Sequence, residues 1–358
     1  MLRYTLVRFL WIFVVLFIIL SINFILLKLA PMYPPATRDD RELWLARQIN
    51  DGYYIEILET DPDFITLFRT NPEQIRQKNH FYRDEGNAIR IYKPVPVPVQ
   101  YFRWISNIVL DWNWGLSTQV EVNRPAFSVL TAKMPVTLRL NIIALIFYIP
   151  IGFTFGIIAA LKKNSVADNL ISLGVMIFIS IPVFVTMTIL LMILGYGLEW
   201  VPTQFPARDI ASASVQIRGL ILPVLGLSFG TIAGLTRVTR AELSEVLTSE
   251  FVLLARTKGL TRAQAVLRHA MRNSMVPLVP GIIFSFVTLL SGSVVIERIY
   301  GIPGTGGVYL DALREGAIDY NVILVVTAFY TTIGLFAILL VDLSYGLVDP
   351  RIRMGARK

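Results

Sequence analysis

Six long runs of apolar residues, separated by shorter charged segments, dominate the pattern of this chain. They cover residues 9–27, 138–161, 170–194, 220–236, 276–295 and 321–345. As helices that rise about 1.5 Å per residue, runs of this length cross the roughly 30 Å hydrocarbon core of a bilayer. The pattern therefore predicts an all-α fold: a polytopic integral membrane protein with six transmembrane helices.

The first apolar run follows Arg3 and Arg8, as the core of a signal peptide also would. It is longer than the usual apolar core of about 7–15 residues, and no small-x-small cleavage site follows it. We therefore interpret it as a retained helix, with a signal peptide as the alternative.

Residues 32–137 form the one long polar segment, which the six-helix pattern places outside the membrane. Twelve Lys and Arg nearly balance thirteen Asp and Glu, a net charge of −1. Short helices are predicted at residues 39–49 and 63–78, and a polyproline-like spacer at residues 92–98. Aromatic and apolar side chains at helical spacing over residues 99–109 predict a helix at the outer membrane interface.

Composition and charge support this topology. Hydrophobic residues make up 54% of the 358 residues and charged residues only 16%, far from the balance of a soluble globular protein. The N-terminus, residues 162–168 and 237–272, and the C-terminal end carry fifteen Lys and Arg against five acids, a net charge of +10. This asymmetry follows the positive-inside rule, so both termini are expected in the cytoplasm.

Residues 250–277 predict two short helices joined by a turn. Ser249 is a suitable N-cap for the first helix, and Gly259 is a suitable stop. Phe251, Leu254 and Ala255 share one face, and apolar residues on the other side make the helix apolar nearly all round. A helix too short to span a bilayer and this apolar must be covered by a partner.

The second short helix is predicted from a capping box at Thr261 and Gln264. Its apolar face comprises Ala263, Val266, Leu267, Ala270 and Met271. Its other side carries Arg262, Arg268, His269 and Arg272, which suit anionic headgroups or an acidic protein surface.

The stretch FVLLARTKGLTRAQAVLRHAMRNSMVP, residues 251–277, resembles the cytoplasmic loop of ABC importer permeases of the dipeptide, oligopeptide and nickel branch. The general motif has an acidic residue where this chain has Leu253 and a proline where it has Arg272; both departures are usual for the B-type subunit, whose proline comes later, at Pro277. The resemblance implies that the first helix docks in a groove of the ATPase. The implied ATPase-coupling residues are Phe251, Leu254, Ala255, Arg256, Lys258 and Gly259. An ordinary membrane-surface helix is the alternative.

The C-terminal third is similar to oligopeptide permeases through ERIYGIPGTGG, residues 297–307, and VDLSYGLVDPRIR, residues 341–353. The resemblance runs from Met1 to Arg353, except that the loop after the first helix is enlarged. It implies a permease subunit of an ATP-driven peptide importer, working with a second permease, two ABC ATPase subunits and an extracytoplasmic substrate-binding protein. ATP and Mg would bind to the ATPase partners. The alternative cargoes are dipeptides, nickel and oligosaccharides.

No residues on the chain indicate a reaction or a cofactor. The glycine-rich residues 301–307 lack the Lys and Ser/Thr of a phosphate-binding loop, and no catalytic motif is present. Cysteine is absent, and His80 and His269 lie far apart in sequence. We therefore expect no catalytic, cofactor or metal site, no nucleic-acid partner, and energy supplied by another chain.

Polar residues within the apolar runs are the candidates for a translocation path, because lipid-facing positions tolerate few of them. Ser285, Thr288 and Ser291 form a partial stripe on the fifth run, and Asn141 lies in the second. Close helix packing is the alternative role. Asp342 is expected to pair with a basic loop residue or to act in gating, and Glu297 with Arg298 to form part of an outer gate.

The expected organisation is an N-terminal helix at 1–31, an extracytoplasmic lobe at 32–137, a five-helix core at 138–350 with its coupling loop at 240–275, and a cytoplasmic tail at 351–358. The lobe is either a docking surface for a capture protein or a cap over the outer mouth. Rival interpretations are a secondary transporter working alone and a membrane-anchored scaffold that uses residues 32–137. A secondary transporter would carry internal repeats and a paired intramembrane charge, and neither is visible.

Overall fold

The computed structural model describes residues 2–30, 33–57, 81–84, 89–206, 212–289 and 293–348. Within them, five helices are long and apolar enough to cross a membrane: Thr5–Leu29, Ala126–Leu161, Ser214–Leu247, Arg262–Val287 and Tyr320–Tyr345. A bent pair, Val166–Ser180 and Val183–Gly197, raises the number to six if it counts as one span. The chain divides into two compact units.

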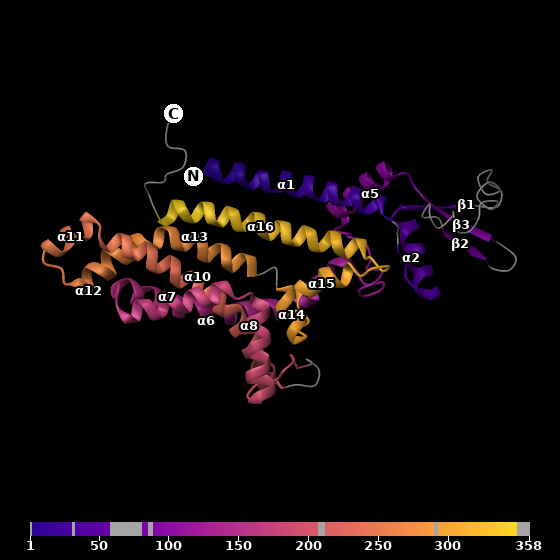
Figure 1. The fold of residues 1–358 in the computed structure, drawn as a ribbon. Helices are drawn as coiled ribbons and strands as arrows, with labels where there is room; N and C mark the ends of the chain where they lie inside the picture. The colour runs from indigo at the N-terminus through magenta and orange to yellow at the C-terminus, as the bar shows by residue number, and fades with distance from the viewer. Residues whose placement is uncertain are drawn as a thin grey trace. The chain divides into compact units, whose positions relative to one another are not determined.

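The first unit, called the core unit, comprises Met1–Ile12, Lys133–Gly307 and Thr332–Lys358. It contains most of α6 (Ala126–Leu161), then α7 (Val166–Ser180), α8 (Val183–Leu190), the π-helical η1 (Leu191–Gly197) and α9 (Ala213–Gly219). These are followed by α10 (Ile221–Leu247), α11 (Glu250–Thr257), α12 (Arg262–Ala265), η2 (Val266–Ala270), α13 (Met271–Leu289) and α14 (Val294–Tyr300). Figure 1 shows α11 and α12 together beyond the end of α10, which also packs against α7 and α13.

The third predicted span is not continuous. Its two halves, α7 and α8 with η1, are bent by 103° at a break that contains Ile181 and Pro182. Ile181 is extended, at φ −83° and ψ 123°, because the residue before a proline is excluded from the helical region. Pro182 then becomes the N-cap of α8, where its missing N–H leaves no helical bond unmade. The apolar length predicted this element, but the proline bends it.

The second helix of the cytoplasmic loop and the fifth span are one continuous helical stretch, Arg262–Val287, rather than two elements. No helix breaker lies between Thr261 and Pro277, and the π-helical turn η2 joins α12 to α13. The predicted span to residue 295 ends earlier, since α13 ends at Leu289 and α14 begins at Val294.

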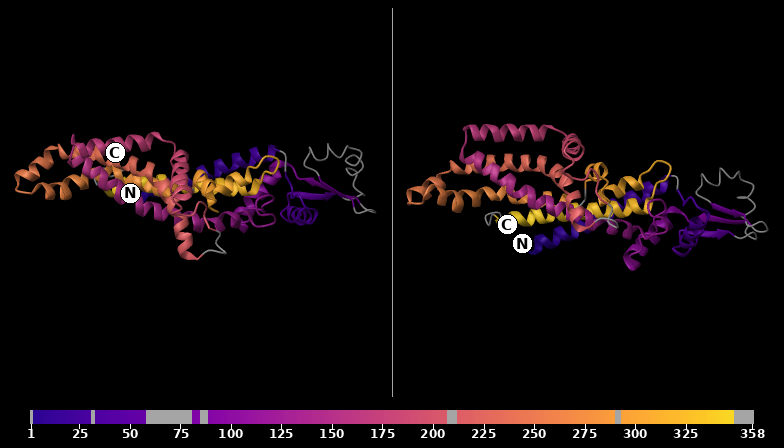
Figure 2. Two further views of the ribbon diagram at one scale, coloured as in Figure 1. Left: turned by 60° about the horizontal axis from the view of Figure 1, so that its bottom comes forward. Right: turned by 90° about the horizontal axis from the view of Figure 1, so that it is seen from below.

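The second unit, called the lobe unit, comprises Phe13–Ala132 and Val308–Thr331. It contains most of α1 (Leu2–Leu29), α2 (Arg38–Asn50), β1 (Tyr54–Ile57), β2 (Phe81–Asp84), β3 (Ile89–Pro94) and α5 (Val97–Asp111). It also holds most of α15 (Thr305–Ala312) and the start of α16 (Tyr320–Val348). The strands form an antiparallel sheet in the order β1-β3-β2. In Figure 2 the indigo helix α2 lies beside the purple strands, and α2 contacts β1.

The sheet was not predicted, although the fold remains predominantly helical. The predicted helices at 39–49 and 99–109 are confirmed as α2 and α5. The predicted helix at 63–78 lies outside the described residues. The predicted polyproline spacer at 92–98 is wrong, because Tyr92 to Pro94 pair with β1 and Val97 already begins α5. Each proline sits where its missing N–H does no harm: Pro94 ends the strand, Pro96 is the N-cap and Pro98 is in the first turn.

Aromatic rings form the centre of the lobe unit. The Phe24 and Trp104 rings are stacked with centroids 4.8 Å apart, and Trp44 meets Tyr54 edge-on at 5.8 Å. Trp44, Tyr54 and Trp104 are all buried. Rings of this size bury a large apolar area per residue, so a lobe with one small sheet can still hold a core.

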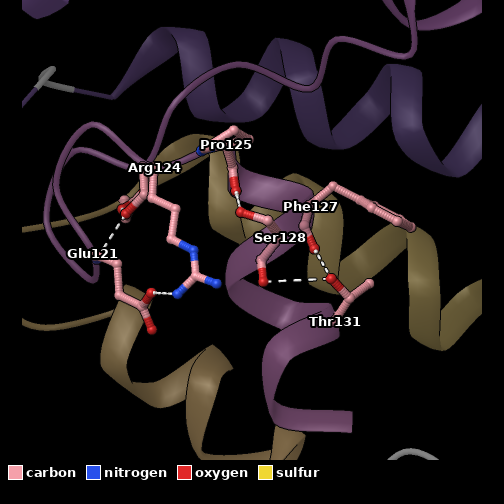
Figure 3. Close-up of polar contacts among 8 residues, drawn as sticks. Glu121, Arg124, Pro125, Phe127, Ser128 and Thr131 are labelled. Carbon is pink, nitrogen blue, oxygen red and sulfur yellow. Dashed lines mark hydrogen bonds and ion pairs between the residues drawn. The ribbon is translucent and has the colours of Figure 1, made fainter.

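The start of α6 is held by local hydrogen bonds within the lobe unit (Figure 3). The Ser128 hydroxyl donates to the Pro125 carbonyl at 2.7 Å, and the Thr131 hydroxyl donates to the Phe127 carbonyl at 3.1 Å. Arg124 pairs with Glu121 in the preceding turn. These contacts close the turn that leads into the longest helix of the chain.

Candidate functional site

The short helix α11 is closed at both ends by local geometry. Ser249 occupies the N-cap position with extended backbone, but its hydroxyl donates to the Val246 carbonyl at 2.6 Å and does not cap the helix. At the other end Gly259 has φ +93°, and its N–H donates to Arg256 O at 3.0 Å. The Leu260 N–H reaches back to Ala255 O at 3.3 Å. This pair of bonds is a Schellman motif, which ends the helix sharply.

The two sides of α11 have different environments. Val252 and Ala255 are 3% and 6% exposed and belong to an apolar cluster with Leu243 and Ala265. On the outside, the apolar side chains of Phe251, Leu253 and Leu254 are 42%, 62% and 55% exposed. Ala255 was expected on the same face as Phe251 and Leu254, but its methyl group packs against its own chain; its coupling role stays a prediction.

Two basic side chains extend the exposed side of α11. Arg256 in the last turn and Lys258 at the C-cap are both exposed. Together with Phe251, Leu253 and Leu254 they form the α11 surface, an apolar patch with a cationic border. Contiguous exposed apolar side chains next to charged residues are typical of protein-contact sites, so the α11 surface is a candidate for one.

The loop after α11 is anchored to the core unit. Thr261 N–H donates to Gln264 Oε1 at 3.1 Å and Gln264 N–H donates to Thr261 Oγ1 at 3.3 Å, which confirms the predicted capping box. Arg262 donates to the Leu161 carbonyl at 3.2 Å. The buried side chains of this stretch are Ala265, Val266 and Ala270, whereas Ala263 and Leu267 of the predicted face are exposed. The π-helical turn changes the helical phase and explains the difference.

A groove of about 290 Å³ lies between α6, α10 and α13 of the core unit. Ser285 is one of its lining residues, and the others are Tyr148, Thr231, Gly234, Leu235, Val238, Pro277, Leu278, Gly281 and Ile282. Of the other path candidates, Asn141 is 2% exposed and does not line this groove. Thr288 lies on α13, but its side chain is outside the described part, and Ser291 lies outside the described residues.

Two charged residues singled out from the sequence have partners within the core unit. Asp342 pairs with Arg8 at 3.2 Å. Its partner is thus a basic residue, but one on the helix α1 and not the expected loop residue. Glu297 is 2% exposed and accepts hydrogen bonds from the Gly307 N–H at 2.9 Å and the Thr137 hydroxyl at 3.1 Å. Burial raises the pKa of Glu297 above its ordinary value, while the bonds from Gly307 and Thr137 oppose the rise.

Two glycines of residues 301–307 leave room for the buried carboxyl group of Glu297. A Cβ added at Gly304 would lie 2.3 Å from Glu297 Oε1 and 2.6 Å from Thr137 Oγ1. A Cβ at Gly306 would lie 2.9 Å from the Val294 backbone nitrogen and 3.0 Å from Glu297 Oε2. The glycine-rich turn thus wraps an acidic side chain of its own chain. Among the described residues, no group of three or more His, Asp or Glu side chains could hold a metal ion.

The apolar helices, the short helix α11 with its exposed apolar surface and the groove define a multi-pass membrane protein. Residues 152–354 match the family described as binding-protein-dependent transport system inner membrane component. The chain therefore belongs to this family. The dipeptide transport system permease protein DppB of Lactococcus lactis is 35% identical over 72% of this chain and 82% of its own. The oligopeptide transport system permease protein AppB of Bacillus subtilis is 32% identical over 72% of this chain and 81% of its own.

Among solved structures, the chain is similar to an amino acid ABC transporter solved with histidines. The two are 18% identical, with a TM-score of 0.46, over 61% of this chain and 92% of the other. Membership of the family confirms two predictions made from the sequence: a predominantly helical multi-pass membrane fold, and the role of a transporter permease subunit rather than of an enzyme.

Proposed function

We propose that this chain is a permease subunit of an ATP-driven importer of peptides. It forms the translocation path with a second, related permease and works with two ABC ATPase subunits and an extracytoplasmic substrate-binding protein. ATP and Mg bind to the ATPase subunits. Membership of the family supports the assignment to a binding-protein-dependent importer. The peptide cargo is supported by the names of the relatives, which are dipeptide and oligopeptide transport permeases.

The exposed α11 surface is the observation that carries this proposal. Its apolar side chains, Phe251 and Leu254 foremost, insert into the ATPase partner, and Arg256 and Lys258 pair with acidic groups at the edge of that contact. Val252 and Ala255 pack α11 against α10 and α13 of its own chain. A displacement of α11 by the ATPase partner therefore moves α10 and α13 with it. Gly259 ends α11 sharply, so the helix stays short.

The proposed topology follows the charge distribution. The cationic segments, including α11 and both termini, face the cytoplasm, and the lobe at residues 32–137 lies outside the cell membrane. The groove that Ser285 lines is the proposed part of the path on this chain. Its small residues and hydroxyl groups suit a peptide backbone that must pass without being held.

The proposal is tested by placing a negative charge at two apolar positions of the α11 surface. In the assembled transporter, Phe251→Glu and Leu254→Glu are expected to lower substrate-stimulated ATP hydrolysis and peptide uptake at least tenfold, because a buried unpaired carboxylate opposes docking. Leu267→Glu is the matched control, since Leu267 is 70% exposed on η2, outside α11. Uptake by Leu254→Glu at the level of Leu267→Glu would reject α11 as the coupling element.

The identity of the transported substrate is tested separately from the coupling to the ATPase. Uptake of labelled dipeptides, longer peptides, nickel and an oligosaccharide by the assembled transporter distinguishes the alternatives, and peptide uptake is expected to exceed the others. The scaffold interpretation of residues 32–137, with inert spans, predicts no peptide uptake by the assembled transporter. Uptake by the intact chain therefore counts against it.

A further inference from the structure

A small cavity lies inside the lobe unit. Its volume is about 40 Å³, enough for a group of only a few heavy atoms. The lining comes from the outer part of α1, from α2 and α5, from the turn after α5 and from the start of α16. The residues that matter for its chemistry are Lys28, Trp104, Trp114 and Thr118.

Three polar groups on this lining lack a hydrogen-bond partner in the part of the chain that the structure describes. They are the indole N–H groups of Trp104 and Trp114 and the hydroxyl of Thr118. The three residues are only 6%, 9% and 7% exposed. Burying a donor without a partner is destabilising, so three such polar groups around one cavity favour an occupant that accepts hydrogen bonds.

The same cavity contains a cationic side chain. The Lys28 ammonium lies 5.5 Å from the centroid of the Phe24 ring and 5.4 Å from that of Tyr53. Aromatic faces stabilise a cation, but they leave its three N–H donors without acceptors. Within the described residues no carboxylate forms an ion pair with Lys28. The positive charge of the cavity is therefore not neutralised by the described part of the lobe.

We propose that this cavity binds one compact monovalent anion, a halide or a carboxylate group, between Lys28 and the two indoles. An anion accepts from every one of these donors and supplies the missing negative charge. Water suits the site less well, because a water molecule accepts only about two hydrogen bonds and carries no negative charge to balance the Lys28 ammonium. The site joins α1, α5 and the start of α16 of the lobe unit, so its occupant stabilises the fold of the lobe. This inference does not depend on the proposed transport function.

The test measures the thermal unfolding midpoint of the full-length chain in lipid nanodiscs during titration with sodium chloride or sodium formate. Sodium gluconate at equal ionic strength is the control, because gluconate is too large for the cavity. A saturable rise in the midpoint with chloride or formate, absent with gluconate, is expected. Bromide soaked into crystals should give an anomalous peak beside the Lys28 ammonium. Equal responses to all three salts, or no bromide peak, would mean that the cavity holds water only and would overturn the proposal.

Variants assign the effect to the cavity. Lys28→Met is expected to abolish the anion-dependent rise, Lys28→Arg to retain it, and Trp104→Phe to weaken the apparent affinity at least threefold. Lys163→Met and Trp200→Phe are the matched controls, since both side chains are exposed on the core unit. A full rise in a stably folded Lys28→Met protein would refute the site.

Discussion

The guanidinium of Arg240 binds both carboxylate oxygens of Asp168. The Nε–Oδ1 distance is 2.5 Å and the Nη2–Oδ2 distance is 2.8 Å. Asp168 is 1% exposed at the start of α7, and it also accepts from the Asn164 N–H at 2.9 Å. Arg240 lies on α10, ten residues before α11 begins. This bidentate pair joins α7 to the helix that leads into the α11 surface.

Breaking this pair from the arginine side should destabilise the core unit. Arg240→Met leaves the Asp168 carboxylate buried without its cation, and the free energy of unfolding should fall by about 2–3 kcal/mol, reduced from the cost in a fully buried pair because Arg240 is one-third exposed. Thermal unfolding in nanodiscs measures the effect, with the exposed Arg237→Met as control. The double variant Asp168→Asn with Arg240→Met should recover part of the loss, and a double variant as unstable as the sum of the singles would contradict a direct pair.

Gly259 should tolerate no side chain without a conformational cost. Its φ of +93° is unfavourable for any residue with a Cβ, although no atom lies within 4 Å of a Cβ built there. Gly259→Ala is therefore expected to cost about 1 kcal/mol and to lower coupled ATP hydrolysis by loosening the end of α11. Gly334→Ala is the control, because Gly334 lies in α16 with equal space and no positive φ. Equal behaviour of the two alanine variants would show that the turn at Gly259 is unimportant.

Asp319 should be essential to the lobe unit. Its buried carboxylate accepts from the Ser117 hydroxyl at 2.6 Å and from the backbone N–H groups of residues 118, 119 and 120 at 2.9, 3.0 and 3.2 Å. Asp319→Ala leaves these donors unpaired and should cost about 3 kcal/mol or more, seen as faster proteolysis of the lobe. Asp319→Asn should cost less. Asp311→Asn, at a partly exposed ion pair with Arg314, is the control and should leave proteolysis unchanged.

Glu297 should make stability fall as the pH rises. Burial raises its pKa in the folded protein, so the folded state binds this proton more tightly than the unfolded state does. The stabilising contribution is therefore complete below the ordinary pKa of about 4.3 and is lost as the pH rises through the raised value. The stability of the wild type relative to Glu297→Gln should decline across this range in thermal unfolding. A relative gain for the wild type at higher pH would reverse the assigned direction.

The elements around α11 illustrate what can be predicted from neighbouring residues. Glu250 and Gly259 bound the predicted helix, and the observed helix is Glu250–Thr257 with Gly259 just past its cap. The capping box at Thr261 and Gln264 was predicted in full. Caps and helix stops act over three to five residues, so the amino-acid order specifies them without reference to the rest of the chain.

The covered side of α11 illustrates what neighbouring residues cannot predict. An apolar helix with Phe251, Val252, Leu254 and Ala255 has no side that its own pattern marks as inward. Contacts with Leu243 and Ala265 bury Val252 and Ala255, and leave Phe251 and Leu254 outside. The path candidates were equally ambiguous, since a buried Asn141 and a groove-lining Ser285 look alike in an apolar run.

The sequence by itself determined the membrane class, the six apolar elements, the caps of the cytoplasmic loop and the helices α2 and α5. Those properties depend on hydrophobic length, charge and residues within a few positions of each other. Only the tertiary structure decided the buried carboxyl of Glu297 and the charged cavity at Lys28. Glu297 meets Thr137 across 160 residues of sequence, and Asp319 meets Ser117 across 202. Such partners are chosen by the packing of whole helices, because no local interaction brings them together.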